Sequence, residues 1–183
     1  MTFRCFGTGD PLYETYHDTE WGVPPEPTPD ERELFERVSL EAFQSGLSWI
    51  TILRKRPRFR EVFAGFEPEV VARFGEEDVA RLMADPGIIR NRAKIEATIS
   101  NARLVTEMAE GELDALLWSF APTEPRRRPR GFADLPATTP ESDAGSKALR
   151  TRGFRFVGST TLYALMQSAG MVDDHIEGCW RAQ

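Results

Sequence analysis

The sequence predicts an all-α fold, and three features support this prediction. Apolar residues recur at steps of three and four positions through much of the chain, which is the spacing of one helix face. Strict alternation of apolar and polar residues, which would indicate half-buried strands, is not evident. Gly153 and Gly170 each close a periodic segment, as glycine often does at a helix C-terminus.

The first expected helix begins near Asp30, and the later helices follow from the same spacing. Leu34, Val38 and Ala42 recur at four-residue steps in the first helix. A longer helix is expected from about Asn91 to Glu110. Shorter helices are expected over residues 68–74, 76–84, 113–120, 140–153 and 159–170, and a long polar loop rich in Pro and Arg over 121–140.

Composition limits the class of protein. With 183 residues, 40% hydrophobic and 10% aromatic, the chain is expected to form a single domain, 1–183, with an ordinary globular core. Because no apolar run approaches a membrane span and the first residues lack a secretory pattern, we expect a cytoplasmic protein with no membrane partner. The net charge of −6 argues against a generally basic surface. Local basic clusters at 54–60, 90–94, 126–130 and 147–155 can still bind phosphates, although they can equally be solvated helix ends.

All cysteines and histidines of the chain stand near its two ends, as Cys5, His17, His175 and Cys179. On a helix or a tight turn, His175 and Cys179 would project to one side. Two thiolates and two imidazoles complete a tetrahedral zinc shell and leave no position open for substrate or water. The pattern therefore predicts a structural zinc ion that joins the termini. A Cys5–Cys179 disulfide, or four unrelated residues, are alternatives that the spacing leaves open.

A carboxylate lies on the apolar face of the first predicted helix. Glu41 follows Leu34 by seven positions and Val38 by three, so it is expected to point inward. An inward carboxylate is costly unless it is paired or receives a polar or cationic ligand. Beside aromatic faces it would suit a flat cation; a Glu41 paired with an arginine in an aromatic core is the alternative. The aromatic candidates are Tyr13, Tyr16, Trp21 and Trp49, the last just beyond a break at Ser45-Gly46.

The stretch "VARLMADPGIIRNRAKIEATI" predicts two helices joined by a tight turn. Gly87 would let the backbone approach another molecule closely. The start of the second helix offers free N–H groups and a positive dipole end, with Arg90, Arg92 and Lys94 nearby. Together these would form a phosphate clamp that reads no sequence. An ordinary helical corner is the alternative.

These segments resemble the 3-methyladenine DNA glycosylase I family, a branch of the helix-hairpin-helix glycosylases. The resemblance extends from "RCFGTGDPLYETYHDTEWGVP" through "LEAFQSGLSWITIL" and "DPGIIRNRAKI" to "SKALRTRGFRFVGSTTLYALMQSAGMVDDHIEGC". It implies a helix-hairpin-helix at about 76–110, and zinc on the four Cys and His residues. Relatives often carry a Trp two places after the first cysteine, whereas this chain reads Cys5-Phe6-Gly7, which leaves one pocket wall in doubt, with Phe6 as the candidate substitute. The resemblance carries over Tyr16, Trp21, Glu41 and Trp49 to the base pocket, Tyr13 and Gln44 beside it, and Gly46-Leu47 to a loop inserted into DNA.

The family implies a monofunctional enzyme that flips N3-methyladenine out of double-stranded DNA and excises it by hydrolysis. In this hypothesis the flipped base stacks on Trp49, and Glu41 and Tyr16 recognise it. A monomer is expected, because excision needs only one chain. Three other classes compete with this interpretation: a module that binds alkylated DNA without cleaving it, a zinc hydrolase, and a structural helical adaptor. A filled zinc shell argues against the hydrolase, and an adaptor leaves the inward Glu41 unexplained.

Overall fold

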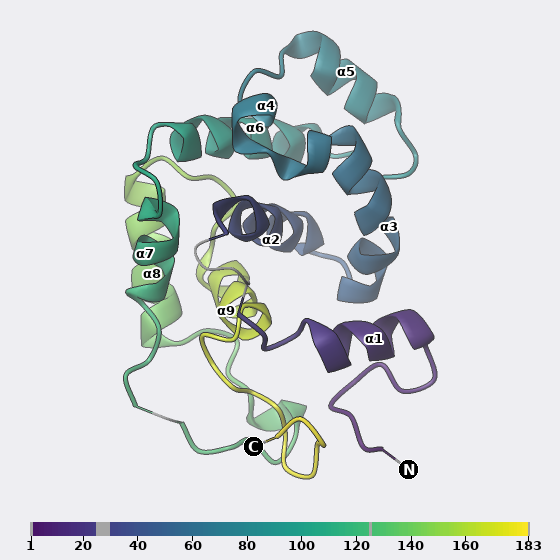
Figure 1. Ribbon diagram of the computed structural model, residues 1–183, viewed down its shortest axis with the longest axis vertical. Helices are drawn as coiled ribbons and strands as arrows, with labels where there is room; N and C mark the ends of the chain where they lie inside the picture. The colour runs from purple at the N-terminus through teal and green to yellow at the C-terminus, as the bar shows by residue number, and fades with distance from the viewer. Residues whose placement is uncertain (1, 25–29, 125, 183) are drawn as a thin grey trace.

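The computed structural model describes residues 2–24, 30–124 and 126–182. Every regular element in these ranges is helical, which confirms the all-α prediction (Figure 1). None of the described helices is long and apolar enough to cross a membrane. The elements are α1 (Pro11–Thr19), α2 (Glu31–Gln44), α3 (Trp49–Val62), η1 (Ala64–Phe66), α4 (Pro68–Val71), α5 (Glu76–Ala84), α6 (Arg92–Thr106), α7 (Glu112–Trp118), η2 (Phe132–Asp134), α8 (Pro140–Thr151) and α9 (Ser159–Ser168).

Helix α2 runs through the middle of the helical part and contacts α3, α6, α7 and α9 (Figure 1). All ten residues of its second to fourth turns, 34–43, are buried, polar ones included. The apolar stripe seen in the sequence is therefore only one side of a helix that is enclosed all round. Buried charges on such a helix need partners. Glu36 has one in Arg56 of α3, whose Nε lies 2.6 Å from Glu36 Oε1.

The sequence analysis did not identify two helices, α1 and α3. Helix α1 begins with the pair Asp10-Pro11, in which the Asp10 side chain accepts hydrogen bonds from the first-turn N–H groups and proline occupies the first position. Helix α3 contains one of the basic clusters and continues through Pro57, which is exposed. Buried Ile52 and Phe59 hold the inner face of α3 to the core and so offset the lost backbone hydrogen bond.

The predicted ends of the helices needed one substantial correction. Helix α6 ends at Thr106 and not near Glu110, because the chain turns through Gly111 in the left-handed conformation and starts α7. Gly170 follows the end of α9, as predicted. At Gly170, with φ +73°, a Cβ would lie 2.8 Å from Gly22 O, so only glycine lets the N-terminal segment approach this closely.

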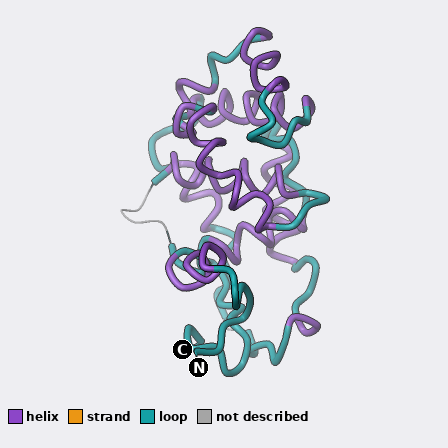
Figure 2. Tube along the Cα trace, turned by 90° about the vertical axis from the view of Figure 1, so that its right-hand side faces the viewer, coloured by secondary structure: helices purple, strands orange, loops and turns teal. Residues whose placement is uncertain are grey.

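Loops dominate the part of the molecule that holds both chain ends (Figure 2). The long polar loop expected over 121–140 is present in its described residues and contains the short helix η2. The terminal segments contact one another there, since Trp180 N donates a hydrogen bond to Phe3 O at 3.0 Å. The residues predicted to form the base pocket lie between this loop-rich part and the packed helices.

Candidate active site and metal centre

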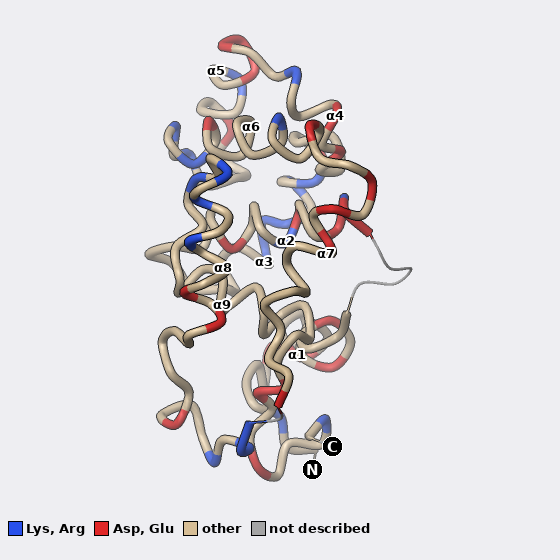
Figure 3. Tube along the Cα trace, turned by 90° about the vertical axis from the view of Figure 1, so that its left-hand side faces the viewer, with Lys and Arg blue, Asp and Glu red and all other residues tan. Residues whose placement is uncertain are grey.

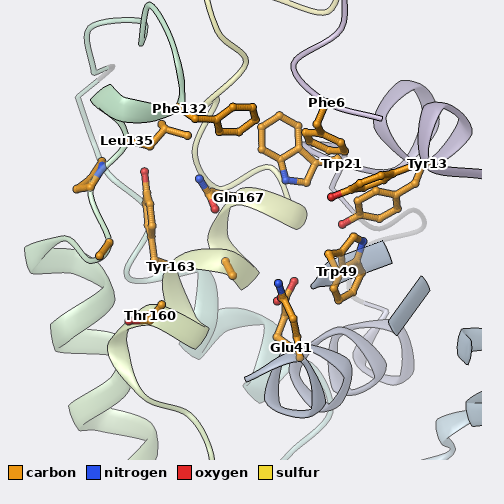
Figure 4. Close-up of a pocket in the computed structure, with 15 residues that line it drawn as sticks. Phe6, Tyr13, Trp21, Glu41, Trp49, Phe132, Leu135, Thr160, Tyr163 and Gln167 are labelled. Atoms are coloured by element: carbon orange, nitrogen blue, oxygen red, sulfur yellow. The ribbon is translucent and has the colours of Figure 1, made fainter. Parts of the chain in front are cut away.

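A cavity of about 370 Å³ opens between the helical and loop-rich parts (Figure 4). The N-terminal segment, α1, the junction of α2 and α3, the loop around η2, and α9 all contribute to its walls. All six residues that the sequence analysis placed in the base pocket line this one cavity: Tyr13, Tyr16, Trp21, Glu41, Gln44 and Trp49.

Glu41 is the acidic residue of the cavity wall and is only 5% exposed. Burial raises its pKa to about 8, while a hydrogen bond with Ser168 and the positive charge of Arg37 act in the opposite direction. Arg37 is not available as its ion-pair partner, because its guanidinium holds Glu33 (Nη2–Oε1, 2.5 Å) and Ser168 O (Nη1–O, 2.6 Å). No ion pair among the described residues involves Glu41. The cavity thus contains a desolvated carboxyl group that a cation would stabilise in its ionised form.

Aromatic rings surround this carboxyl group. Trp49, the first residue of α3, and Tyr16 of α1 lie with ring centroids 5.4 Å apart. Burial, and next the charge of Glu41, raise the pKa of Tyr16 well above its usual value, so its hydroxyl remains a donor. Phe6 packs edge-on against Trp21 at 5.0 Å and tilted against Tyr13 at 4.8 Å. Phe6 therefore forms the wall that the sequence comparison left in doubt.

The opposite wall contains residues that the sequence analysis missed. The segment of α9 was predicted only as a helix, yet four of its residues line the cavity. The loop over 121–140 was interpreted as polar surface, and its apolar residues form the rim of the cavity (Figure 4). The missed residues are Phe132, Leu135, Pro136 and Ala137 of the loop and Thr160, Tyr163, Ala164 and Gln167 of α9.

The four Cys and His side chains meet in a buried cluster near the chain ends. Their ligand atoms all lie within 4.8 Å of one another. Cys5 Sγ is 3.5 Å from His175 Nδ1, and Cys179 Sγ is 3.4 Å from His17 Nε2 and 3.7 Å from His175 Nδ1. Tetrahedral zinc bonded to sulfur and nitrogen would separate these atoms by about 3.6 Å. The spacing and the donor set therefore fit a metal ion of this type.

The surroundings of the cluster also suit a metal. His17 Nδ1 lies 2.8 Å from Asp18 Oδ1, a contact that turns Nε2 toward the cluster. Burial lowers the pKa of His175 to about 4 and raises that of the Cys5 thiol to about 12. The imidazole is thus a neutral ligand, and a cation would be needed to keep the thiolate. Both cysteines are free thiols, so the disulfide alternative is not realised.

The segment from His175 to Cys179 forms a turn and not a helix. Cys179 N donates a hydrogen bond to Ile176 O at 3.0 Å, and Gly178 between them adopts φ +83°. Of the two geometries expected for this spacing, the tight turn is therefore the one present.

The hairpin between α5 and α6 is present, but its side chains differ from the prediction. Lys94 is buried, and its Nζ donates hydrogen bonds to Phe43 O at 2.9 Å and Ser45 O at 2.7 Å. The prediction that Lys94 contacts phosphate is therefore wrong, since its ammonium group satisfies carbonyl groups at the end of α2. Gly87 packs tightly within the chain itself, because a Cβ there would lie 2.6 Å from Arg58 Cγ.

The remaining residues assigned to DNA binding are accessible. Arg90 is exposed, and Arg92 is exposed but forms ion pairs with Glu76 at 2.9 Å and Glu96 at 3.3 Å. Between α2 and α3, Gly46 adopts φ +84° and Leu47 is 42% exposed. This turn projects an apolar side chain close to the cavity, since Gln44 and Trp49 on either side of it are lining residues.

Comparison with known proteins identifies a family and close relatives. Residues 6–182 match the family model described as methyladenine glycosylase. The chain is 49% identical over 180 residues to DNA-3-methyladenine glycosylase 1 of Escherichia coli (strain K12), covering 96% of this chain and 95% of that protein. It is 43% identical over 183 residues to DNA-3-methyladenine glycosylase of Haemophilus influenzae, covering 98% and 97%.

Solved structures show the same fold. The crystal structure of a 3-methyladenine DNA glycosylase I superposes with a TM-score of 0.92 at 46% identity, covering 99% of this chain and 100% of that chain. A variant 3-methyladenine DNA glycosylase I in complex with 3-methyladenine gives a TM-score of 0.89 at 33% identity, covering 100% and 98%. With a family match over nearly its full length and these relatives, the chain belongs to the methyladenine glycosylase family.

Proposed function

We propose that this chain excises N3-methyladenine from alkylated double-stranded DNA by hydrolysis of the N-glycosidic bond. The observation that carries this proposal is the buried Glu41, which has no ion-pair partner among the described residues and faces a cavity lined with aromatic rings. Family membership and relatives named as 3-methyladenine glycosylases support the same activity.

The chemistry of the substrate explains why such a pocket suffices. Methylation at N3 makes the base cationic, so the glycosidic bond is weakened and the departing base is neutral. No side chain needs to protonate the leaving group. The enzyme has instead to select the alkylated base, and a carboxylate in a low-dielectric cavity favours a cation over neutral adenine. Stacking between aromatic rings adds about 1–3 kcal/mol per base.

The roles of the cavity residues follow from their positions. Trp49 provides a stacking surface, and Tyr16 is a hydrogen-bond donor beside it. Glu41 accepts hydrogen bonds from the base edge and stabilises its positive charge. Tyr13, Trp21 and Gln44 line the same cavity and enclose the base.

We further propose that the Cys and His cluster binds one structural zinc ion. Cys5, His17, His175 and Cys179 supply all four ligands, so the ion takes no part in the reaction. A bound zinc joins the N-terminal segment, which provides Phe6 and Tyr16, to the C-terminal segment. It thereby fixes one wall of the cavity.

The DNA-binding surface is proposed to include the hairpin and the projecting turn. Backbone N–H groups at the start of α6, with Arg90 and Arg92, would contact phosphates. Leu47 on the turn after α2 would occupy the space that the flipped nucleotide leaves. A monomer acting in the cytoplasm on nucleoid DNA is sufficient for this activity.

The direct test is incubation of the purified protein with methylated double-stranded DNA, followed by identification of the released bases. We expect 3-methyladenine to be released by the wild type and far more slowly by Glu41→Gln and Trp49→Ala. Binding of alkylated DNA without release of any base would instead support a non-catalytic module. Release of no base and no preference for alkylated DNA would refute both.

A further inference from the structure

The α9 wall of the cavity contains a hydrogen-bonded network that the mechanism above does not use. Figure 4 shows Tyr163 and Gln167 of α9 on one side of the cavity and Glu41 and Trp49 on another. Behind them lies Asp174, which is only 5% exposed. Its Oδ2 accepts hydrogen bonds from the Tyr163 hydroxyl and, at 2.9 Å, from Gln167 Nε2.

The direction of each hydrogen bond in this network is fixed by chemistry. Arg126 Nη2 lies 3.1 Å from the Tyr163 oxygen, and a guanidinium can only donate. The Tyr163 oxygen therefore accepts from Arg126, and its single proton points to Asp174 Oδ2. Because this carboxylate oxygen is an acceptor, the Gln167 atom facing it has to be the amide nitrogen and not the oxygen.

This orientation leaves the amide oxygen of Gln167 facing away from Asp174. Gln167 lines the cavity, and no hydrogen bond among the described residues ends on its Oε1. A free glutamine could rotate its amide and present either a donor or an acceptor. Here Asp174 removes that choice, so the cavity contains a second fixed acceptor in addition to the Glu41 carboxylate.

We propose that Gln167 is a specificity-determining residue and that Asp174 is its positioning residue. The Gln167 amide oxygen accepts a hydrogen bond from the exocyclic amino group of the flipped base and thereby selects 6-aminopurines over 6-oxopurines. This inference rests on the proposed function, because it specifies which alkylated purines the same pocket accepts.

The amino group at C6 of a purine suits two acceptors, because it carries two N–H bonds. Glu41 can take one and Gln167 the other. An oxygen at C6 has only lone pairs, so it would face Gln167 Oε1 without a proton between them. Placing two acceptors together in a partly desolvated site rejects the wrong ligand more strongly than the loss of one hydrogen bond would.

Methylated DNA offers an internal comparison, because it contains both 3-methyladenine and 3-methylguanine. The measurement is the ratio of kcat/KM for their release by the wild type, Gln167→Leu, Gln167→Met and Asp174→Asn. Asp143→Asn is the matched control, because it changes the net charge by the same amount as Asp174→Asn. Asp143 is exposed on α8 and has no ion-pair partner among the described residues.

We expect the wild type to prefer 3-methyladenine and the Gln167 variants to lose about tenfold of this preference, as expected for one hydrogen bond. Asp174→Asn should reduce the preference less, because asparagine can also donate and so lets the Gln167 amide rotate. Asp143→Asn should leave the ratio unchanged. Equal losses for both bases in the Gln167 and Asp174 variants would overturn the inference, since they indicate only a structural role.

A binding experiment keeps the test valid if a variant folds poorly. Quenching of tryptophan fluorescence by free 3-methyladenine and by 3-methylhypoxanthine, which carries oxygen at C6, reports the same preference without turnover. Gln167→Met keeps the length of the side chain and serves if Gln167→Leu is unstable. Equal discrimination by wild type and Gln167→Met would also overturn the inference. A wild type that releases neither base would refute the proposed function itself, which is a distinct outcome.

Discussion

The helical part and the loop-rich terminal part of the molecule are held together by different forces. Phenylalanines from α2, α3 and the following turns form a large core, in which Phe43, Phe59 and Phe63 are fully buried. The terminal part has a much smaller apolar cluster, which includes the two metal-cluster cysteines among its six buried members. Apolar burial therefore orders the helical part, while the terminal part, with few buried apolar residues, would depend on the metal ion proposed for its Cys and His cluster.

The largest expected effect comes from removing a metal ligand. Cys179→Ala should lower the stability of the holoprotein by about 4 kcal/mol, or roughly 8–16 °C in Tm, because the terminal segments lose their cross-link. Affinity for 3-methyladenine should fall with it. Calorimetry, zinc analysis and base binding measure the three effects. A zinc-free variant that is stable and fully active would contradict this account of the terminal part.

On the helical side of the cavity, Glu41→Gln should reduce kcat/KM for 3-methyladenine release by about 30- to 150-fold, or roughly 2–3 kcal/mol. This is the range expected for a hydrogen bond to a charged partner. Steady-state excision assays on methylated DNA measure it. Tm should not fall, because the substitution removes a desolvated carboxyl group without creating a cavity. Unchanged activity would rule out charge recognition by Glu41.

The raised pKa of Glu41 also predicts how stability depends on pH. With a folded pKa of about 8 and an ordinary value of 4.5, the folded state holds this proton where the unfolded state has lost it. The contribution of Glu41 to the free energy of unfolding is therefore fully present below about pH 4.5 and is lost as pH rises toward 8. In denaturant titrations of the ligand-free protein, the free energy of unfolding should decline less over this pH window in Glu41→Gln than in the wild type. Parallel curves for the two proteins would contradict a raised pKa.

A substitution of Lys94 tests whether this residue stabilises the hairpin or contacts phosphate. Lys94→Met should destabilise the protein by about 2 kcal/mol, because the buried carbonyl group of Phe43 and the partly buried one of Ser45 lose their donor. The salt dependence of DNA binding should keep its slope, unlike the loss of a phosphate contact. Urea denaturation and binding at several salt concentrations separate the two roles. A reduced slope with unchanged stability would restore the phosphate contact predicted from the sequence.

The smallest effect is expected at Arg90, which is exposed and lies in the turn before α6. Arg90→Ala should leave the free energy of unfolding within about 0.5 kcal/mol of the wild-type value. It should lower the slope of log K against log salt by about one for double-stranded DNA. No change in slope would place the phosphate contacts elsewhere.

The sequence predicted most of the polar and aromatic side chains of the candidate site, but it did not predict the second wall that encloses the cavity. The Cys and His cluster was predicted because the chain has only two cysteines and two histidines, and Glu41 was singled out because a carboxylate interrupts an apolar face. Tyr163 and Gln167 were missed, since a cavity wall and a core face have the same helical spacing. That distinction depends on what packs opposite, which no local pattern contains.

Two errors have a related physical cause. Lys94 was assigned to the surface because of its charge, although it stands four positions before Thr98 on the inner face of α6. A long lysine can bury its stem and still satisfy its ammonium group on backbone carbonyls. Helix α3 was overlooked because of Pro57 and its many arginines, yet tertiary packing overrides these local preferences.

The contact made by Lys94 has a geometric consequence for damage search. Its ammonium group links the first turn of α6 to the carbonyl groups at the start of the Leu47 turn through two hydrogen bonds, which constrain the distance between the hairpin and this turn. In the proposed DNA-binding mode, a duplex resting on the hairpin would therefore meet Leu47 at a fixed number of base steps away. The protein could probe each nucleotide at a constant offset as it slides, with no need to rearrange between one step and the next.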